Sequence, residues 1–258
     1  TRQQTAALAE LYDAAKVPAQ WPAALQGVAA AVGGIGAAEV VCNKRTGGVE
    51  WVTITGPCAE FEPRYISHYA PLDLYAPALH AQPTRRWLPL SRSLPEGVGA
   101  GNAWYNDFIL KSGVADILAA KMYEDEDTTV LLGIHRGPAC ERAVAQFNAG
   151  VRALMQPLAH ATRLHVAFRR MGRALGAAQQ ALQYLAVGVV LADTEGHVLE
   201  ANALAAEILD SKDGLLIRDG RLTAIRTFEA AKLAAAIAGR PQDGTCEEGH
   251  LLIGRQGG

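Results

Sequence analysis

The sequence predicts an α+β protein in which antiparallel sheets are covered by helices. Three observations support this class. Short β-branched segments occur in pairs joined by turns, alanine-rich segments with helical spacing flank these pairs, and a long helical stretch lies between the two groups of pairs. The 258 residues are enough for one or two domains. We expect two modules, residues 1–165 and 166–258, joined by a helix around residues 141–184.

The first module is predicted to be one antiparallel sheet with helices on its faces. Its strands are expected as two hairpins, the first closed by a glycine-containing loop and the second by the acidic turn Glu124–Asp127. Apolar residues at helical spacing precede, separate and follow these hairpins. The expected helices span residues 1–15, 18–33, 61–69 and 104–111, and the expected strands span residues 38–43, 49–55, 115–123 and 128–135.

Residues 141–184 are predicted to form the long helix. Their apolar residues recur with alternating three- and four-residue spacing, interrupted near Gly172 and Gln179, as in a helix that packs against a partner over several turns. A helix shared by two modules can transmit a change from one to the other. The alternative is two ordinary core helices, each closing its own domain. The apolar positions are Phe147, Val151, Leu154, Leu158, Ala161, His165, Phe168, Gly172, Leu175 and Leu182.

The second module is predicted to contain two hairpins and two helices. Asn202 is expected to cap the first helix, and Asp219-Gly220 is the strongest short hairpin signal in the chain. The expected strands span residues 188–193, 197–200, 215–218, 221–223 and 249–255, and the expected helices span residues 203–209 and 227–238.

Composition excludes several classes of protein. The 24 Lys and Arg residues nearly balance the 26 Asp and Glu residues, so the chain lacks the basic bias of a nucleic-acid-binding domain. No apolar run approaches the ~20 residues of a membrane-spanning helix, and no secretory leader is visible. The four cysteines form no C-x-x-C pair, which indicates reduced thiols and a cytoplasmic location.

A proline-rich segment, residues 72–98, concentrates aromatic and polar side chains and predicts a small-molecule pocket. Asp73 could accept a hydrogen bond from a ligand N–H group, and the polar tips of Trp87 and Tyr69 suit a carbonyl. The alternative is that the aromatic residues are core and that Asp73 caps the loop after Pro71. The candidate walls of the pocket are Trp51, Trp104, Tyr105 and Phe108.

No residue pattern indicates catalysis, a metal or a cofactor. His68 and His80 could bind a metal with Asp73, but no third strong ligand lies at a known spacing. The chain contains neither G-x-S-x-G nor H-E-x-x-H. We therefore expect a protein that is not an enzyme.

Three stretches resemble the sensor region of LuxR-type helix-turn-helix regulators. The first, Tyr65-x-x-x-Tyr69 followed by Asp73 and Trp87, is similar to the pattern of the family's autoinducer-binding domains, although Leu74 replaces the proline that usually follows the aspartate. The resemblance implies that these four residues line a pocket for an acyl-homoserine lactone. Asp73 and Trp87 would contact its polar head, and the tyrosines would help to hold it.

The other two stretches extend the resemblance over most of the chain. Residues 11–15 and 21–25 are similar to the opening of a large group of proteobacterial LuxR-type regulators. Residues 188–209, with Asp193, Gly196 and Asn202, look like the start of a PAS domain. The resemblance implies a GAF-like or autoinducer-domain-like module followed by an incomplete PAS-like module.

The function implied by the resemblance is ligand sensing for a transcription regulator. A small molecule would change the arrangement of a homodimer, and DNA would be bound only through a helix-turn-helix absent from this sequence. Two alternatives remain open: a ligand-free scaffold for protein interaction or dimerisation, and a sensor whose output is not DNA binding.

Overall fold

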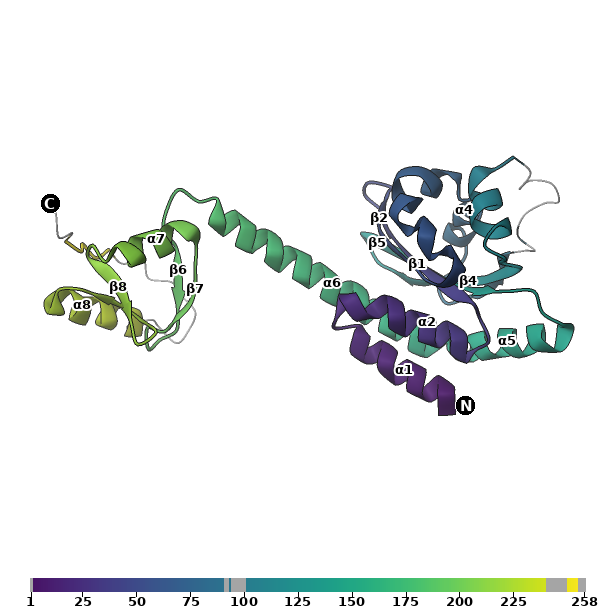
Figure 1. Cartoon of the computed structure of the whole chain (residues 1–258), viewed down its shortest axis with the longest axis horizontal. Coiled ribbons are helices and arrows are strands. Elements are labelled where there is room, and N and C mark those ends of the chain that lie inside the picture. Colours follow the sequence, from purple (N-terminus) through teal and green to yellow (C-terminus); the bar gives the residue numbers. More distant parts are fainter. Residues whose placement is uncertain (1, 91–92, 94–100, 240–249, 255–258) are drawn as a thin grey trace. The chain divides into compact units, whose positions relative to one another are not determined.

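The computed structural model describes residues 2–90, 93, 101–239 and 250–254 (Figure 1). The chain divides into two compact units, Thr1–Met171 (unit 1) and Gly172–Gly258 (unit 2), and the division falls inside helix α6 (Met155–Gln183). Both units combine helices with antiparallel strands, so the predicted α+β class is confirmed. Among the described residues, no helix has both the length and the apolar character needed to cross a bilayer.

Unit 1 is built on a five-stranded antiparallel sheet with the strand order β2-β1-β5-β4-β3. Both predicted hairpins are present, and β5 pairs with β1 as well as with β4. The short edge strand β3 was not expected, because it has two residues and one is a proline. The strands are β1 (Gly36–Asn43), β2 (Val49–Ile54), β3 (Leu88–Pro89), β4 (Asp116–Glu124) and β5 (Thr128–Arg136).

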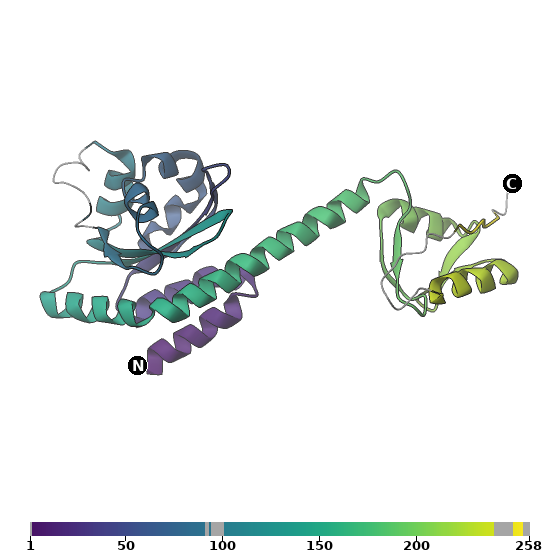
Figure 2. The same cartoon turned by 180° about the vertical axis from the view of Figure 1, so that it is seen from behind.

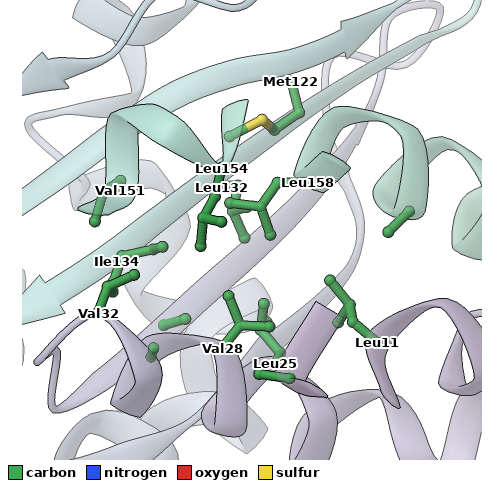
Figure 3. Close-up of a cluster of buried hydrophobic side chains, with 14 of the residues drawn as sticks. Leu11, Leu25, Val28, Val32, Met122, Leu132, Ile134, Val151, Leu154 and Leu158 are labelled. Atoms are coloured by element: carbon green, nitrogen blue, oxygen red, sulfur yellow. The ribbon is translucent and has the colours of Figure 1, made fainter. Parts of the chain in front are cut away.

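One face of this sheet is covered by helices α1 (Arg2–Ala14), α2 (Trp21–Ala31), α5 (Glu141–Ala153) and the first part of α6 (Figures 1 and 2). Their apolar stripes meet the sheet in a cluster of fully buried side chains. Figure 3 shows Leu25 and Val28 on α2 facing Leu132 and Ile134 of β5, with side chains of α5 and α6 completing the cluster. We call this the helical face.

Residues 141–184 form two helices rather than one. Helix α5 ends at Ala153 and α6 begins at Met155, with Leu154 between them. Pro157 explains the break, because its nitrogen cannot donate to the carbonyl of Ala153 and its ring would clash with that group in a continuous helix. Unit 1 is therefore closed by two helices, and α6 alone continues past the end of the unit.

The opposite face of the sheet is covered by short, irregular helical segments, with α4 on the side away from α2 and α5 (Figure 1). The helix predicted over residues 61–69 is a 3₁₀ segment, one α turn and a π turn in series. We call this the cavity face. Its segments are η2 (Gly56–Phe61), α3 (Glu62–Arg64), η3 (Tyr65–Tyr69), η4 (Ala70–Leu72), α4 (Ala76–His80) and η6 (Tyr105–Leu110).

Unit 2 contains two helices and two hairpins, and backbone hydrogen bonds link one hairpin to the other. Val198 N–H donates to the Gly220 carbonyl and Leu222 N–H to the Gly196 carbonyl. Asp219 and Gly220 both have positive φ, as a two-residue type I′ turn requires. The predicted last strand is not formed by residues 250–254, and the rest of it lies outside the described residues. The elements are β6 (Val190–Ala192), β7 (Val198–Ala201), α7 (Ala203–Ser211), β8 (Leu215–Arg218), β9 (Arg221–Ala224) and α8 (Thr227–Ala238).

Asn202 holds the start of unit 2 together. Its side-chain oxygen accepts from the N–H groups of Ala205 and Val189, both at 2.9 Å, so it caps α7 as predicted and also fixes β6. Its side-chain nitrogen donates to the carbonyls of Leu182 (2.9 Å) and Val187 (2.8 Å). The end of α6, the first strand and the first helix of the unit thus depend on one buried amide.

We predict that Asn202→Ala destabilises unit 2 by about 2–4 kcal/mol, because it removes the cap and leaves buried N–H and C=O groups without partners. Asn202→Ser is the matched control, since serine keeps a cap but cannot reach the two carbonyls. Hydrogen exchange of the α7 amides should rank the proteins wild type, Ser, Ala in order of falling protection. Equal protection in all three would contradict this role.

Candidate functional site in unit 1

A small cavity lies between the sheet and the irregular helices of the cavity face. Its volume is about 50 Å³, which is room for a few water molecules and well below the roughly 300–1,000 Å³ of a typical ligand pocket. Its walls come from three strands and from η3, α4 and η6. The lining residues are Ala38, Val40, Tyr65, Asp73, Tyr75, Leu79, Leu90, Trp104, Phe108, Ile117, Ala119, Leu131, Leu132, Gly133 and His135.

Strand alternation explains which sheet residues reach the cavity. On β5, Leu131, Gly133 and His135 are two residues apart and therefore share a face. A Cβ atom on Gly133 would come within 2.8 Å of the Ile117 side chain, so the absence of a side chain there leaves room for the neighbouring strand. Two π turns, η3 and η6, supply Tyr65 and Phe108 from the other side. Such π turns are rare in proteins overall, but those that occur are often found at functional sites.

Asp73 is the centre of a hydrogen-bond network at the cavity wall. The Tyr65 hydroxyl donates to Asp73 Oδ2 at 2.6 Å, and the N–H groups of Tyr75 and Ala76 donate to Oδ1 at 2.8 and 3.2 Å. Burial raises the pKa of the Asp73 carboxyl, and these three hydrogen bonds oppose that rise. The carboxyl therefore ties η3 to the residues that open α4, and it also lines the cavity.

Three aromatic rings continue the wall. Phe108 stacks on Trp104 with ring centroids 5.6 Å apart and meets His135 edge-on at 6.1 Å. The Trp104 indole N–H and the His135 Nδ1 atom are buried and make no hydrogen bond to any described residue. Burial also lowers the pKa of His135 to about 4, so its imidazole is neutral at pH 7. Two residues that line the cavity thus carry a buried polar atom with no hydrogen-bond partner among the described residues.

The structure brings together four of the eight predicted site residues: Tyr65, Asp73, Trp104 and Phe108 all line the cavity. Tyr69 and Tyr105 belong to the same core but do not line it, and the Tyr69 hydroxyl donates to Asp107 Oδ2 at 3.2 Å.

Trp87 and Trp51 lie away from the cavity. Trp87 packs against the core of the helical face. Trp51 is buried beside Val41, Val130 and Val166, with the Arg169 guanidinium 4.9 Å from its ring centroid. The predicted pairing of Asp73 with Trp87 around one ligand is therefore not what this arrangement provides.

His135 was not identified from the sequence. The sequence did contain a signal for this residue, because His135 follows Leu131 and Gly133 on the same face of a predicted strand. A polar residue in phase with buried apolar residues is a candidate functional group, but only once the buried face is known.

Among the described residues, His68, His80 and Asp73 do not form a group whose potential ligand atoms lie within 4.8 Å of one another. His80 Nε2 lies 3.9 Å from the Cys42 sulfur. In unit 2, Asp193, Glu195 and His197 place potential ligand atoms within 4.8 Å of one another. The Asp193 carboxylate is already used in its turn, where it accepts from two backbone N–H groups and from His197 Nδ1. Turn formation accounts for this cluster.

We predict that Asp73→Ala destabilises unit 1 by about 2–3 kcal/mol, because the hydrogen bonds from the N–H groups of Tyr75 and Ala76 and from the Tyr65 hydroxyl are all lost. Asp73→Asn retains the capping oxygen and should cost about 1 kcal/mol. All four tryptophans lie in unit 1, so tryptophan fluorescence during urea unfolding reports this unit. An Asp73→Ala protein as stable as wild type would contradict the structural role of the network.

No family model matches the chain, and no curated protein does. One similar solved structure is CepR2 from Burkholderia cenocepacia, described as an N-acylhomoserine lactone dependent LuxR family transcription factor, with 19% identity, a TM-score of 0.46, and coverage of 63% of this chain and 94% of that one. Another is the VqsR LBD domain from Pseudomonas aeruginosa, with 17% identity, a TM-score of 0.45, and coverage of 64% of this chain and 96% of that one.

Proposed function

We propose that unit 1 is the ligand-sensing domain of a LuxR-type transcription regulator and that its ligand binds in the cavity. The observation that carries this proposal is the cavity itself, which is lined mainly by apolar side chains and also by Asp73, Trp104 and His135. Trp104 Nε1 and His135 Nδ1 are buried and have no hydrogen-bond partner in the part of the chain that the structure describes. Convergent polar groups in an apolar cavity are typical of small-molecule sites. Tyr65 and Asp73, which belong to the pattern that resembles autoinducer-binding domains, line the same cavity.

A ligand larger than a few water molecules has to move the walls of this cavity. The walls opposite the sheet are short helical segments, which are easier to displace than the five-stranded sheet. Binding changes the protein only if the ligand prefers the expanded arrangement over the closed one. The domain therefore responds by repacking η3, α4 and η6 around the ligand.

Strand β1 connects the cavity to helix α6. Ala38 and Val40 line the cavity, whereas Glu39 and Val41, between and beside them, face the helical side, where Glu39 meets His165 of α6. A shift of β1 caused by a ligand would therefore be felt on both faces of the sheet.

Helix α6 is proposed to pair with its copy in a homodimer, and ligand binding is proposed to change the arrangement of that dimer. Phe168, Met171 and Leu175 follow one another at three- and four-residue spacing on this helix, and they are 38%, 67% and 62% exposed. This spacing places them on one face and matches a helix–helix seam. We expect a cytoplasmic protein that is not an enzyme and that binds DNA through a helix-turn-helix domain elsewhere in the protein. Unit 2 is proposed to be the PAS-like module.

A second function is favoured by the small size of the cavity. A volume of about 50 Å³ is also compatible with a filled core, in which Asp73 serves only to bind the N–H groups of Tyr75 and Ala76 before α4. Unit 1 would then be a scaffold for dimerisation that binds no ligand.

The variant Ala119→Val distinguishes the two functions. Ala119 lines the cavity, and the two added methyl groups should fill part of it, which stabilises unit 1 by about 0.5–1 kcal/mol. A sensor should lose its ligand at the same time. The measurement is thermal unfolding of wild type and variant against a set of small uncharged organic compounds. At least one compound should raise the unfolding temperature of wild type and leave that of the variant unchanged.

Ala120→Gly is the matched control, because Ala120 is buried on the helical face. Removing its methyl group leaves the cavity on the other face of the sheet intact. This control should be less stable but should keep the ligand response. If no compound stabilises wild type while Ala119→Val is more stable, the scaffold is the better description.

The dimer is tested with Leu175→Glu. A charge in the exposed apolar stripe of α6 should weaken self-association at least about tenfold, equivalent to ~1.4 kcal/mol, as measured by sedimentation equilibrium. Gln180→Glu is the control, because it adds the same side chain at an exposed position on another face of α6. A wild-type chain that remains monomeric, or equal association by the two variants, would contradict a dimer formed through this stripe.

A further inference from the structure

A carboxyl group and an imidazole meet beneath the sheet in unit 1. Glu39 of β1 and His165 of α6 are both 0% exposed, and Glu39 Oε2 lies 3.7 Å from His165 Nε2. The pair joins the strand that lines the cavity to the helix that continues beyond the unit. Nothing in the proposed ligand site uses either side chain.

This pair is closed off from solvent. The Trp21 indole lies flat on the His165 ring, with centroids 4.1 Å apart and an interplanar angle of 2°. Both Glu39 oxygens, both His165 nitrogens and the Thr162 hydroxyl are buried and make no hydrogen bond to any described residue. Buried polar groups without partners are costly, so their retention in the core indicates a role other than stability.

The charged groups around the pair are few. Arg169 of α6 favours the ionised form of Glu39 and disfavours protonation of His165, while the Trp21 and Trp51 indoles also favour ionised Glu39. The Ala15 carbonyl favours protonated His165. Glu50 and Arg170, the next ion pair along β2 and α6, bind each other at 2.8 Å.

Burial outweighs these charges. It raises the pKa of Glu39 to about 8 and is the largest cause lowering that of His165 to about 4. Because the groups are adjacent, they titrate as a pair, and one ionisable proton belongs to the pair between these limits. A protonated carboxyl can donate to the imidazole after a closure of less than 1 Å, whereas a bare carboxylate would be a buried charge that only the Trp21 and Trp51 indoles and the Arg169 guanidinium favour.

We propose that Glu39 and His165 form a proton-binding site, and that the proton they share holds helix α6 on the sheet, so that its loss above neutral pH loosens α6. The device concerns packing within unit 1 and operates whether or not the cavity binds a ligand.

The pH window follows from the two groups. The raised pKa of Glu39 means that folding takes up a proton, so its contribution to stability is complete below about pH 4.5 and is lost as pH rises to about 8. The lowered pKa of His165 removes stability as pH falls from 6.5 to about 4. The two slopes oppose each other between pH 4.5 and 6.5, and from pH 6.5 to 8 the Glu39 slope acts alone.

Hydrogen exchange of the α6 amides around His165 tests the device. For the full wild-type chain, protection factors corrected for the intrinsic pH dependence of exchange should fall from pH 6.5 to 8, by up to about tenfold per pH unit. Glu39→Gln carries no titrating proton and should give protection that is independent of pH over this window. A Glu39→Gln profile that falls like that of wild type would overturn the proposal.

Glu50→Gln is the matched control, because Glu50 also joins β2 to α6 through Arg170 but is not sealed in the core. It should keep the wild-type slope. If Glu39→Gln does not fold, the Glu39 carboxyl can be titrated directly in the wild-type chain by carbon-13 NMR. A midpoint well above 4.5 supports the site, and a midpoint at or below 4.5 overturns it.

Discussion

The structure of unit 1 depends on a five-stranded sheet that is buried on both faces. Because neighbouring side chains of a strand point to opposite sides, β1, β4 and β5 each contribute to two separate cores. The helical face is a dense aliphatic core, and the opposite face combines aromatic rings with the small cavity. Every residue added to or removed from these strands would exchange the two faces, which fixes the register closely.

Both faces keep polar groups that ordinary packing would avoid. On the cavity face these are Asp73, Trp104 and His135, and on the helical face they are Glu39 and His165. Asp73 already accepts three hydrogen bonds, whereas the proposed ligand would supply partners for Trp104 and His135, and the proposed proton would bridge Glu39 and His165. Strand β1 carries contacts to both sets, so unit 1 has a physical connection between its cavity and α6. The coupling is a proposal that rests on this shared strand.

Much of this architecture could be predicted from local patterns. The hairpins of the first sheet, the cap at Asn202, the Asp219-Gly220 turn and the helix at Thr227–Ala238 each follow from a few adjacent residues. The break at Leu154 had a sequence signal too, in Pro157, but the continuous apolar spacing across it favoured one helix. Strand β3 had no sequence signal, because its pairing with β4 depends on residues far away in the sequence.

The candidate site was predictable only in part, because a local sequence pattern does not show which of two cores a side chain will enter. An aromatic residue near a loop gives no sign of which core it will enter, so Trp51 and Trp87 were grouped with Trp104 although they lie elsewhere. Glu39 and His135 were missed because a polar residue within a strand is normally expected on a solvated face. In a sheet covered on both sides there is no such face, and each polar residue has to be explained.

Native mass spectrometry of the protein purified from the cells that make it tests most directly whether unit 1 binds a small molecule. We predict a species heavier than the polypeptide by the mass of one organic molecule, present in wild type and absent from Ala119→Val, in which the cavity is filled. If both proteins carry only the polypeptide mass, also after incubation with an extract of those cells, the cavity is a packing gap and unit 1 is not a sensor.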